Sequence, residues 1–111
     1  MVALTNLSGE IGGMTLLRAN NPHYLVNDAW VTKGLMLTVQ EGVEIYATGY
    51  YEMRIRGGIT SSMATYTSSF DPPKAGDWKG IVFEDADDSE FKDNTVQYAT
   101  IGIYIKPGGE A

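Results

Sequence analysis

The sequence predicts an all-β protein whose short strands coil into a parallel β-solenoid, and three observations lead to this prediction. Helical periodicity is weak, whereas the apolar stretches are rich in Val, Ile, Thr and Tyr, which suit a pleated surface. Glycine accounts for 13 of the 111 residues, as expected for a chain with many turns rather than a helical bundle. Apolar positions also recur at a fixed interval, the signature of a repeat architecture.

The expected strands are short segments bounded by glycine or by Asn, Asp and Pro clusters. In chain order they cover residues 14–17, 24–26, 29–31, 35–39, 43–47, 52–56, 64–67, 80–84, 95–97 and 100–105. Two segments alternate clearly, since Leu35, Leu37 and Val39 share one face of a strand and Ile81 and Phe83 share another.

The repeat interval is 22 residues, and it relates the apolar centres of four segments. The shift superimposes Leu37, Ile59, Ile81 and Ile103, and two residues later Val39, Ser61, Phe83 and Ile105. A coil of about 22 residues with two or three short strands is what a parallel β-solenoid uses for one rung. The interval predicts four or five stacked rungs in a single domain spanning residues 1–111. An antiparallel β-sandwich is the alternative fold, because short strands with frequent turns also permit it.

The order of the segments between Asn21 and Ile105 is also familiar. "NNPHYLVNDAWVTKGLMLTVQEGVEIYA", then "GDWKGIVFED", then "NTVQYATI" resembles the right-handed parallel β-helix repeats of the pectate-lyase-like superfamily, of the prokaryotic secreted and surface type. The resemblance implies a right-handed parallel β-helix, here as a miniature or a fragment of such proteins. It also implies a secreted or cell-surface location, although the first residues, "MVALTNLSGEIGG", lack the features of a signal peptide.

Charge and composition narrow the classes of partner. The net charge of −6 argues against nucleic acid, which is bound by clustered Lys and Arg, and against an anionic membrane surface. No apolar run approaches the roughly 20 residues that span a bilayer. The absence of cysteine excludes disulfides, thiolate metal sites and a Cys nucleophile.

Aromatic residues are the first candidate ligand-binding groups. Trp78 in "GDWKG" and Tyr50 and Tyr51 in "YATGYYE" have ring faces on which a sugar could stack. The alternative for Trp78 is packing at a corner of the coil, and the two tyrosines are expected in a turn. A polysaccharide is therefore a candidate partner.

An acidic run is the candidate metal site. Asp85, Asp87 and Asp88 provide the oxygen ligands that calcium prefers, but the run lacks the loop glycine and the terminal glutamate of an EF-hand. A solvated loop between two rungs is the favoured interpretation, with adventitious calcium as the alternative and no other cofactor expected. His23 is the single histidine and has no companion ligands for a metal or a catalytic triad.

No catalytic set emerges from the sequence. Glu44 and Glu52 are the pair to consider for a miniature polysaccharide-active enzyme, because paired carboxylates cleave glycosidic bonds. The leading prediction is instead a non-catalytic β-helix module for binding or self-association, and a carbohydrate-binding module is the second alternative.

The ends of a short solenoid predict association. Each terminal rung exposes unpaired strand edges and the apolar interior of the coil, and no amphipathic capping helix is evident in the sequence. We therefore expect a homodimer or a higher homo-oligomer, formed through an open end or a flat side. Met14, Met36 and Ile103 are the candidate interface residues.

Overall fold

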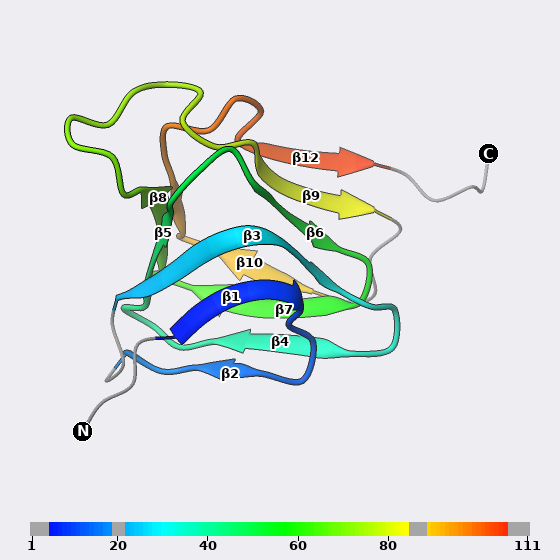
Figure 1. Cartoon of the computed structure of the whole chain (residues 1–111). Coiled ribbons are helices and arrows are strands. Elements are labelled where there is room, and N and C mark those ends of the chain that lie inside the picture. Colours follow the sequence, from blue (N-terminus) through cyan, green and yellow to red (C-terminus); the bar gives the residue numbers. More distant parts are fainter. Residues whose placement is uncertain (1–4, 19–21, 85–88, 107–111) are drawn as a thin grey trace.

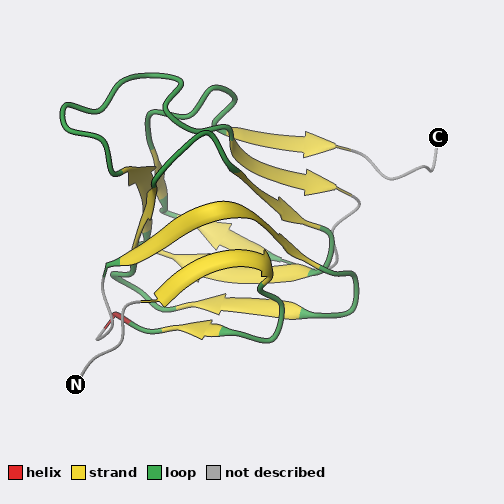
Figure 2. Cartoon of the chain, in the orientation of Figure 1, coloured by secondary structure: helices red, strands yellow, loops and turns green. Residues whose placement is uncertain are grey.

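A computed structural model describes residues 5–18, 22–84 and 89–106, and it shows a right-handed parallel β-solenoid of about four turns (Figure 1). Apart from a short helical turn at Arg18, the described chain consists of strands and loops (Figure 2). Every strand pair in the described ranges is parallel. The predicted right-handed parallel β-helix is confirmed, and the antiparallel sandwich is excluded.

The strands stack on three faces of a roughly triangular coil. They are β1 (Thr5–Glu10), β2 (Thr15–Leu16), β3 (His23–Val31), β4 (Met36–Val39), β5 (Glu44–Ala47), β6 (Glu52–Ile55), β7 (Gly58–Ser62), β8 (Thr65–Ser68), β9 (Gly80–Glu84), β10 (Glu90–Lys92), β11 (Thr95–Val96) and β12 (Ile103–Lys106). The first face carries β5, β8 and β11, the second carries β6, β9 and β12, and the third carries β2, β4, β7 and β10.

Strand β3 bends across the corner between the first and second faces. Its residues 23–25 pair with β5, and its residues 29–31 pair with β6. Strand β1 follows the same path one rung earlier and pairs with both halves of β3. The eight-stranded sheet therefore covers two faces, and the four-stranded sheet closes the third.

The core is made of inward-pointing apolar ladders, one residue from each rung. On the second face Met53 lies beneath Ile81, and Ile81 beneath Ile103. On the third face Leu37 lies beneath Ile59. Burying each fully enclosed Ile, Leu or Met contributes roughly 1.5–3 kcal/mol, so the stability of this fold comes mainly from the ladders.

The predicted repeat is correct at its ends and wrong in its middle. Leu37 pairs with Ile59 and Ile81 with Ile103, as the 22-residue shift requires. Ile59, however, lies on the third face and Ile81 on the second, so these two residues are not equivalent. The rung between them is lengthened by the loop 69–79, which projects from the corner between the first two faces in Figure 1.

Two strands fall where the sequence suggested loops. Strand β1 occupies the N-terminus, and its Leu7 is fully buried despite the nearby glycines. Strand β10 lies in the acidic stretch and pairs with β7. In both places cross-rung pairing overrides weak local β-propensity.

Gly80 explains why glycine precedes a strand in the repeat. Its φ is +123°, and a Cβ there would lie 2.4 Å from the carbonyl oxygen of Gly102 on the next rung. A side chain at this position would therefore prevent β9 and β12 from approaching as they do.

Candidate functional site

The three predicted ligand-binding residues come together at one corner of the coil, between the first and second faces. Tyr50 and Tyr51 lie in the turn from β5 to β6, and Trp78 lies in the loop from β8 to β9 on the next rung. Tyr50 is 57% exposed, whereas Tyr51 is half-buried and packs against the core. The prediction that both lie in a turn is confirmed.

Trp78 is part of the interior of this corner. It is 1% exposed, and its indole Nε1–H donates to the carbonyl oxygen of Gln97 at 2.7 Å. Its own carbonyl accepts the amide of Thr100 at 2.8 Å, and it forms an isolated bridge with Ala99. No ring face is left for a sugar, so the structure favours the packing role of Trp78 over the stacking role.

The loop 69–79 is fastened at several points rather than extending freely. Asp77 Oδ2 accepts bonds from the Ser68 hydroxyl at 2.7 Å and from the Lys74 amide at 2.8 Å. The Lys79 amide donates to the Tyr51 carbonyl on the rung before, and the Gly76 amide donates to the Tyr98 carbonyl on the rung after. These bonds fix the corner relative to both of its neighbouring rungs.

Two further aromatic residues at this corner were not identified from the sequence. Phe70 is 46% exposed in the loop, and Tyr98 is 37% exposed on the last rung. Together with Tyr50, they place one exposed ring on each of three successive rungs. The presence of aromatic residues was visible in the sequence, but their common corner requires the rung assignment.

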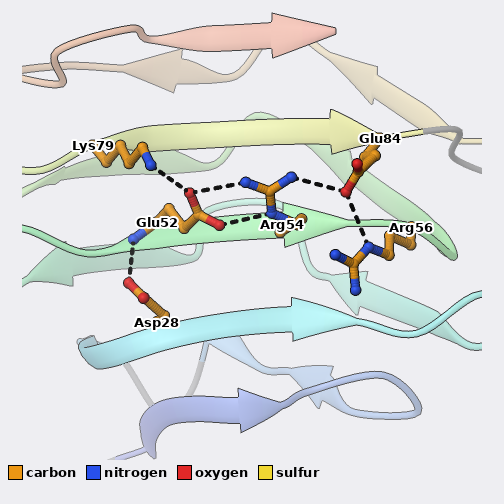
Figure 3. Close-up of polar contacts among 6 residues, drawn as sticks. All are labelled: Asp28, Glu52, Arg54, Arg56, Lys79 and Glu84. Carbon is orange, nitrogen blue, oxygen red and sulfur yellow. Dashed lines mark hydrogen bonds and ion pairs between the residues drawn. The ribbon is translucent and has the colours of Figure 1, made fainter. Parts of the chain in front are cut away.

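The outer surface of the second face carries a charged network (Figure 3). The Arg54 guanidinium, on β6, bonds the Glu52 carboxylate through Nε at 2.8 Å and Glu84, on β9, through Nη1 at 2.8 Å. Arg56 also contacts Glu84 at 3.1 Å, and Lys79 contacts Glu52 at 3.1 Å. The network therefore links β6 to β9 across the outside of the coil.

The same network extends to β3, because the Glu52 amide donates to Asp28 Oδ1 at 3.0 Å (Figure 3). Burial alone raises the pKa of the Glu52 carboxyl, but hydrogen bonds from Arg54 and Lys79 outweigh that effect, so the pKa of Glu52 lies below its usual range. The hydrogen bonds to its carboxylates likewise raise the pKa of the Arg54 guanidinium. A general acid of glycoside cleavage needs a raised pKa, which Glu52 does not have.

The two carboxylates of the enzyme hypothesis lie on different faces. Glu44 begins β5 on the first face and is exposed, whereas Glu52 begins β6 on the second face. Glu44 accepts a bond from the Tyr46 hydroxyl at 3.2 Å on its own strand. The structure does not bring the pair to one site.

The candidate calcium ligands Asp85, Asp87 and Asp88 lie outside the described residues. Among residues 5–18, 22–84 and 89–106, no group of three or more His, Asp or Glu side chains is arranged to hold a metal ion. Within the same ranges, no helix has the length and apolar character needed to cross a bilayer.

His23 opens β3 and is fully buried. Its Nε2 lies 2.9 Å from the carbonyl oxygen of Leu17, while its Nδ1 has no hydrogen-bond partner in the described part of the chain. The imidazole therefore joins the first two rungs from inside the coil.

The C-terminal end of the solenoid is open. Strands β10, β11 and β12 are each the last strand of their sheet on one face, so no described strand pairs with their outer edges. Ile103 is 44% exposed, although Ile81 and Met53 below it in the same ladder are fully buried. Ile101, in the turn before β12, is 40% exposed. An apolar surface and unpaired strand edges thus lie together on one end of the molecule.

The N-terminal end differs. The apolar side chains of the first rung that enter the core, Leu7, Ile11 and Leu16, are at most 1% exposed. Strand β1 also has a register shift between Leu7 and Gly9, and such a bulge protects a sheet edge from pairing. The inside of the coil is therefore accessible at the C-terminal end and covered at the other.

The predicted interface residues do not share one surface. Ile103 lies at the open end, Met36 is 41% exposed on the outside of β4, and Met14 is half-buried against the core. Ile101 was not identified, because it belongs to the expected strand 100–105 and its exposure depends on the absence of a covering rung.

Comparison of the chain with protein-family models, with curated proteins and with solved structures finds no match. The coil geometry and the exposed surfaces therefore carry the functional argument.

Proposed function

We propose that this chain is a non-catalytic β-solenoid module that self-associates through its open C-terminal end. We also propose that it belongs with the right-handed parallel β-helix repeat proteins of the pectate-lyase-like superfamily that its sequence resembles. The observation that supports self-association is the Met53–Ile81–Ile103 ladder, which is buried in its first two members and exposed at its last.

The energetics favour a reversible association. Burying the exposed parts of Ile101 and Ile103 contributes roughly 1 kcal/mol per side chain, about half the value for a fully exposed isoleucine. Pairing the strand edges adds hydrogen bonds worth about 0.5–1.5 kcal/mol each. These gains oppose an association cost of several kcal/mol, so we expect an assembly that depends on protein concentration.

The test is the solution mass, measured by light scattering after size exclusion over a range of concentrations. The end variant carries Ile101→Lys and Ile103→Lys, which place two charges on the proposed interface. A matched control carries Leu17→Lys and Met36→Lys, two residues that are 38% and 41% exposed on the first two rungs. We expect the wild type and the control to associate and the end variant to remain monomeric.

Two results would overturn the proposal. A wild type that is monomeric at every concentration would show that the open end does not self-associate. Loss of association in the control but not in the end variant would place the interface on the side of the coil. Circular dichroism of both variants verifies that the solenoid is intact.

A second candidate function is carbohydrate binding at the corner with one exposed ring on each of three rungs. Tyr50, Phe70 and Tyr98 favour it, because exposed aromatic faces stack on sugar rings. Calorimetric titration with soluble oligosaccharides tests it, with Tyr50→Ala and Phe70→Ala as the variants that should abolish the binding heat. Heat that persists in both variants, or no heat with the wild type, would count against it.

A further inference from the structure

We infer that the partner at the open end is a second copy of this chain related by a twofold axis, so that two C-terminal rungs meet head to head in a closed dimer. This inference rests on the proposed self-association and specifies its geometry. The alternative is a head-to-tail stack, in which the C-terminal end of one copy contacts the N-terminal end of the next.

The difference between the two ends selects the head-to-head arrangement. In a head-to-tail contact the exposed Ile101 and Ile103 would face the first rung, whose core side chains are already buried. The bulge in β1 also disrupts the edge that β12 would have to pair with. In a head-to-head contact both exposed apolar surfaces cover each other, as an isologous interface requires. A head-to-tail contact that does not close also propagates into a filament, which the covered N-terminal end prevents.

The strand lengths locate the axis. A twofold axis perpendicular to the coil, through the middle of the second face, places β12 antiparallel to its own copy and β10 opposite the partner's β11. Strand β12 has four residues, whereas β10 has three and β11 has two. This choice pairs the longest edge with itself and the two shorter edges with each other, which maximises the backbone hydrogen bonds formed.

The charges at the opposite corner agree with this axis. An axis through the middle of one side of a triangle also passes through the facing corner, which here is the turn between β10 and β11. Lys92 and Asp93 are adjacent and exposed in that corner. The rotation brings Lys92 of one copy near the same corner of the other copy, where Asp93 carries the opposite charge.

Cysteine cross-linking tests the geometry, because the chain has no native cysteine. Tyr104→Cys introduces a thiol at an exposed position of β12, near the proposed axis, and Ser8→Cys introduces one at an exposed position of β1. Lys92→Cys, near the axis at the far corner, is a second reporter in case the Tyr104 variant is poorly folded. Each variant is treated with a short flexible bis-maleimide, alone and as an equal mixture, and the products are resolved by denaturing electrophoresis and mass spectrometry.

The expected result is a covalent dimer of the Tyr104→Cys and Lys92→Cys proteins alone and none of the Ser8→Cys protein. Cross-linking only between Tyr104→Cys and Ser8→Cys chains in the mixture would overturn the twofold geometry in favour of a head-to-tail stack, while leaving self-association intact. Cross-linking of Ser8→Cys alone would place the contact at the wrong end. The absence of every cross-link in a chain that light scattering finds monomeric would refute the geometry and the proposed function together.

Discussion

Replacing Trp78 by alanine tests whether the most individual segment of this chain is scaffold. The ring is 1% exposed, and its Nε1–H donates to the Gln97 carbonyl at 2.7 Å. A buried Trp→Ala change typically costs about 3–5 kcal/mol of unfolding free energy, which includes the cavity left behind. That loss is a large part of the roughly 5–15 kcal/mol that stabilises a domain of this size. Trp78→Phe retains much of the apolar contact but leaves the Gln97 carbonyl unpaired, so we expect it to cost about 1–3 kcal/mol.

The assay is urea unfolding followed by circular dichroism, at a protein concentration low enough to keep the chain monomeric, because association would add to the apparent stability. Tyr50→Ala is the matched control from the same corner, where the ring is 57% exposed. We expect this control to change the unfolding free energy by no more than about 0.5 kcal/mol. A Trp78→Ala protein that lost less than the Tyr50→Ala protein would refute the assignment of Trp78 to the interior.

Three further predictions concern polar groups. Asn94→Ala removes three hydrogen bonds that join two rungs at the third corner, and we expect it to cost about 1–3 kcal/mol in the same urea assay. Burial raises the pKa of the Tyr66 phenol, whose oxygen lies 2.7 Å from Ser61 Oγ, so in a spectrophotometric titration this tyrosine should ionise only when the chain unfolds. Tyr66→Phe should remove that late step, and its persistence would contradict the assignment. The pKa of Glu52 is lowered in the folded state, so its contribution is present above its usual range and is lost as the pH falls through the folded value. The gap in unfolding free energy between wild type and Glu52→Gln should therefore narrow from neutral to acidic pH, and a gap that widened would be inconsistent with the network.

The sequence predicted the fold through short-range signals, and it failed where the signals are long-range. Alternation within residues 35–39 and 80–84 identified β4 and β9, and the 22-residue interval correctly paired each with its neighbour. The interval failed between Ile59 and Ile81 because the loop 69–79 changes the length of one rung, and a fixed shift cannot detect that. Strand β1 was missed because its partner β3, rather than its own glycine-containing sequence, makes it a strand.

The candidate sites were predicted less completely than the fold. Residue type alone drew attention to Trp78 and Tyr50, but only the coil geometry shows that one ring is buried and the other exposed. The difference between the two ends had no local signal at all. Leu7 and Ile103 are similar apolar residues in β-like segments, and their opposite exposure depends on which rung covers them.

Hydrogen exchange measured at two protein concentrations tests the open C-terminal end most directly. In the monomer, the outer edges of β10, β11 and β12 lack a partner strand in the described chain, so their outward amides should exchange quickly. We predict that raising the concentration slows exchange in residues 90–106 and leaves residues 5–16 unchanged. Equal exchange at both concentrations, or slowing confined to residues 5–16, would contradict the account.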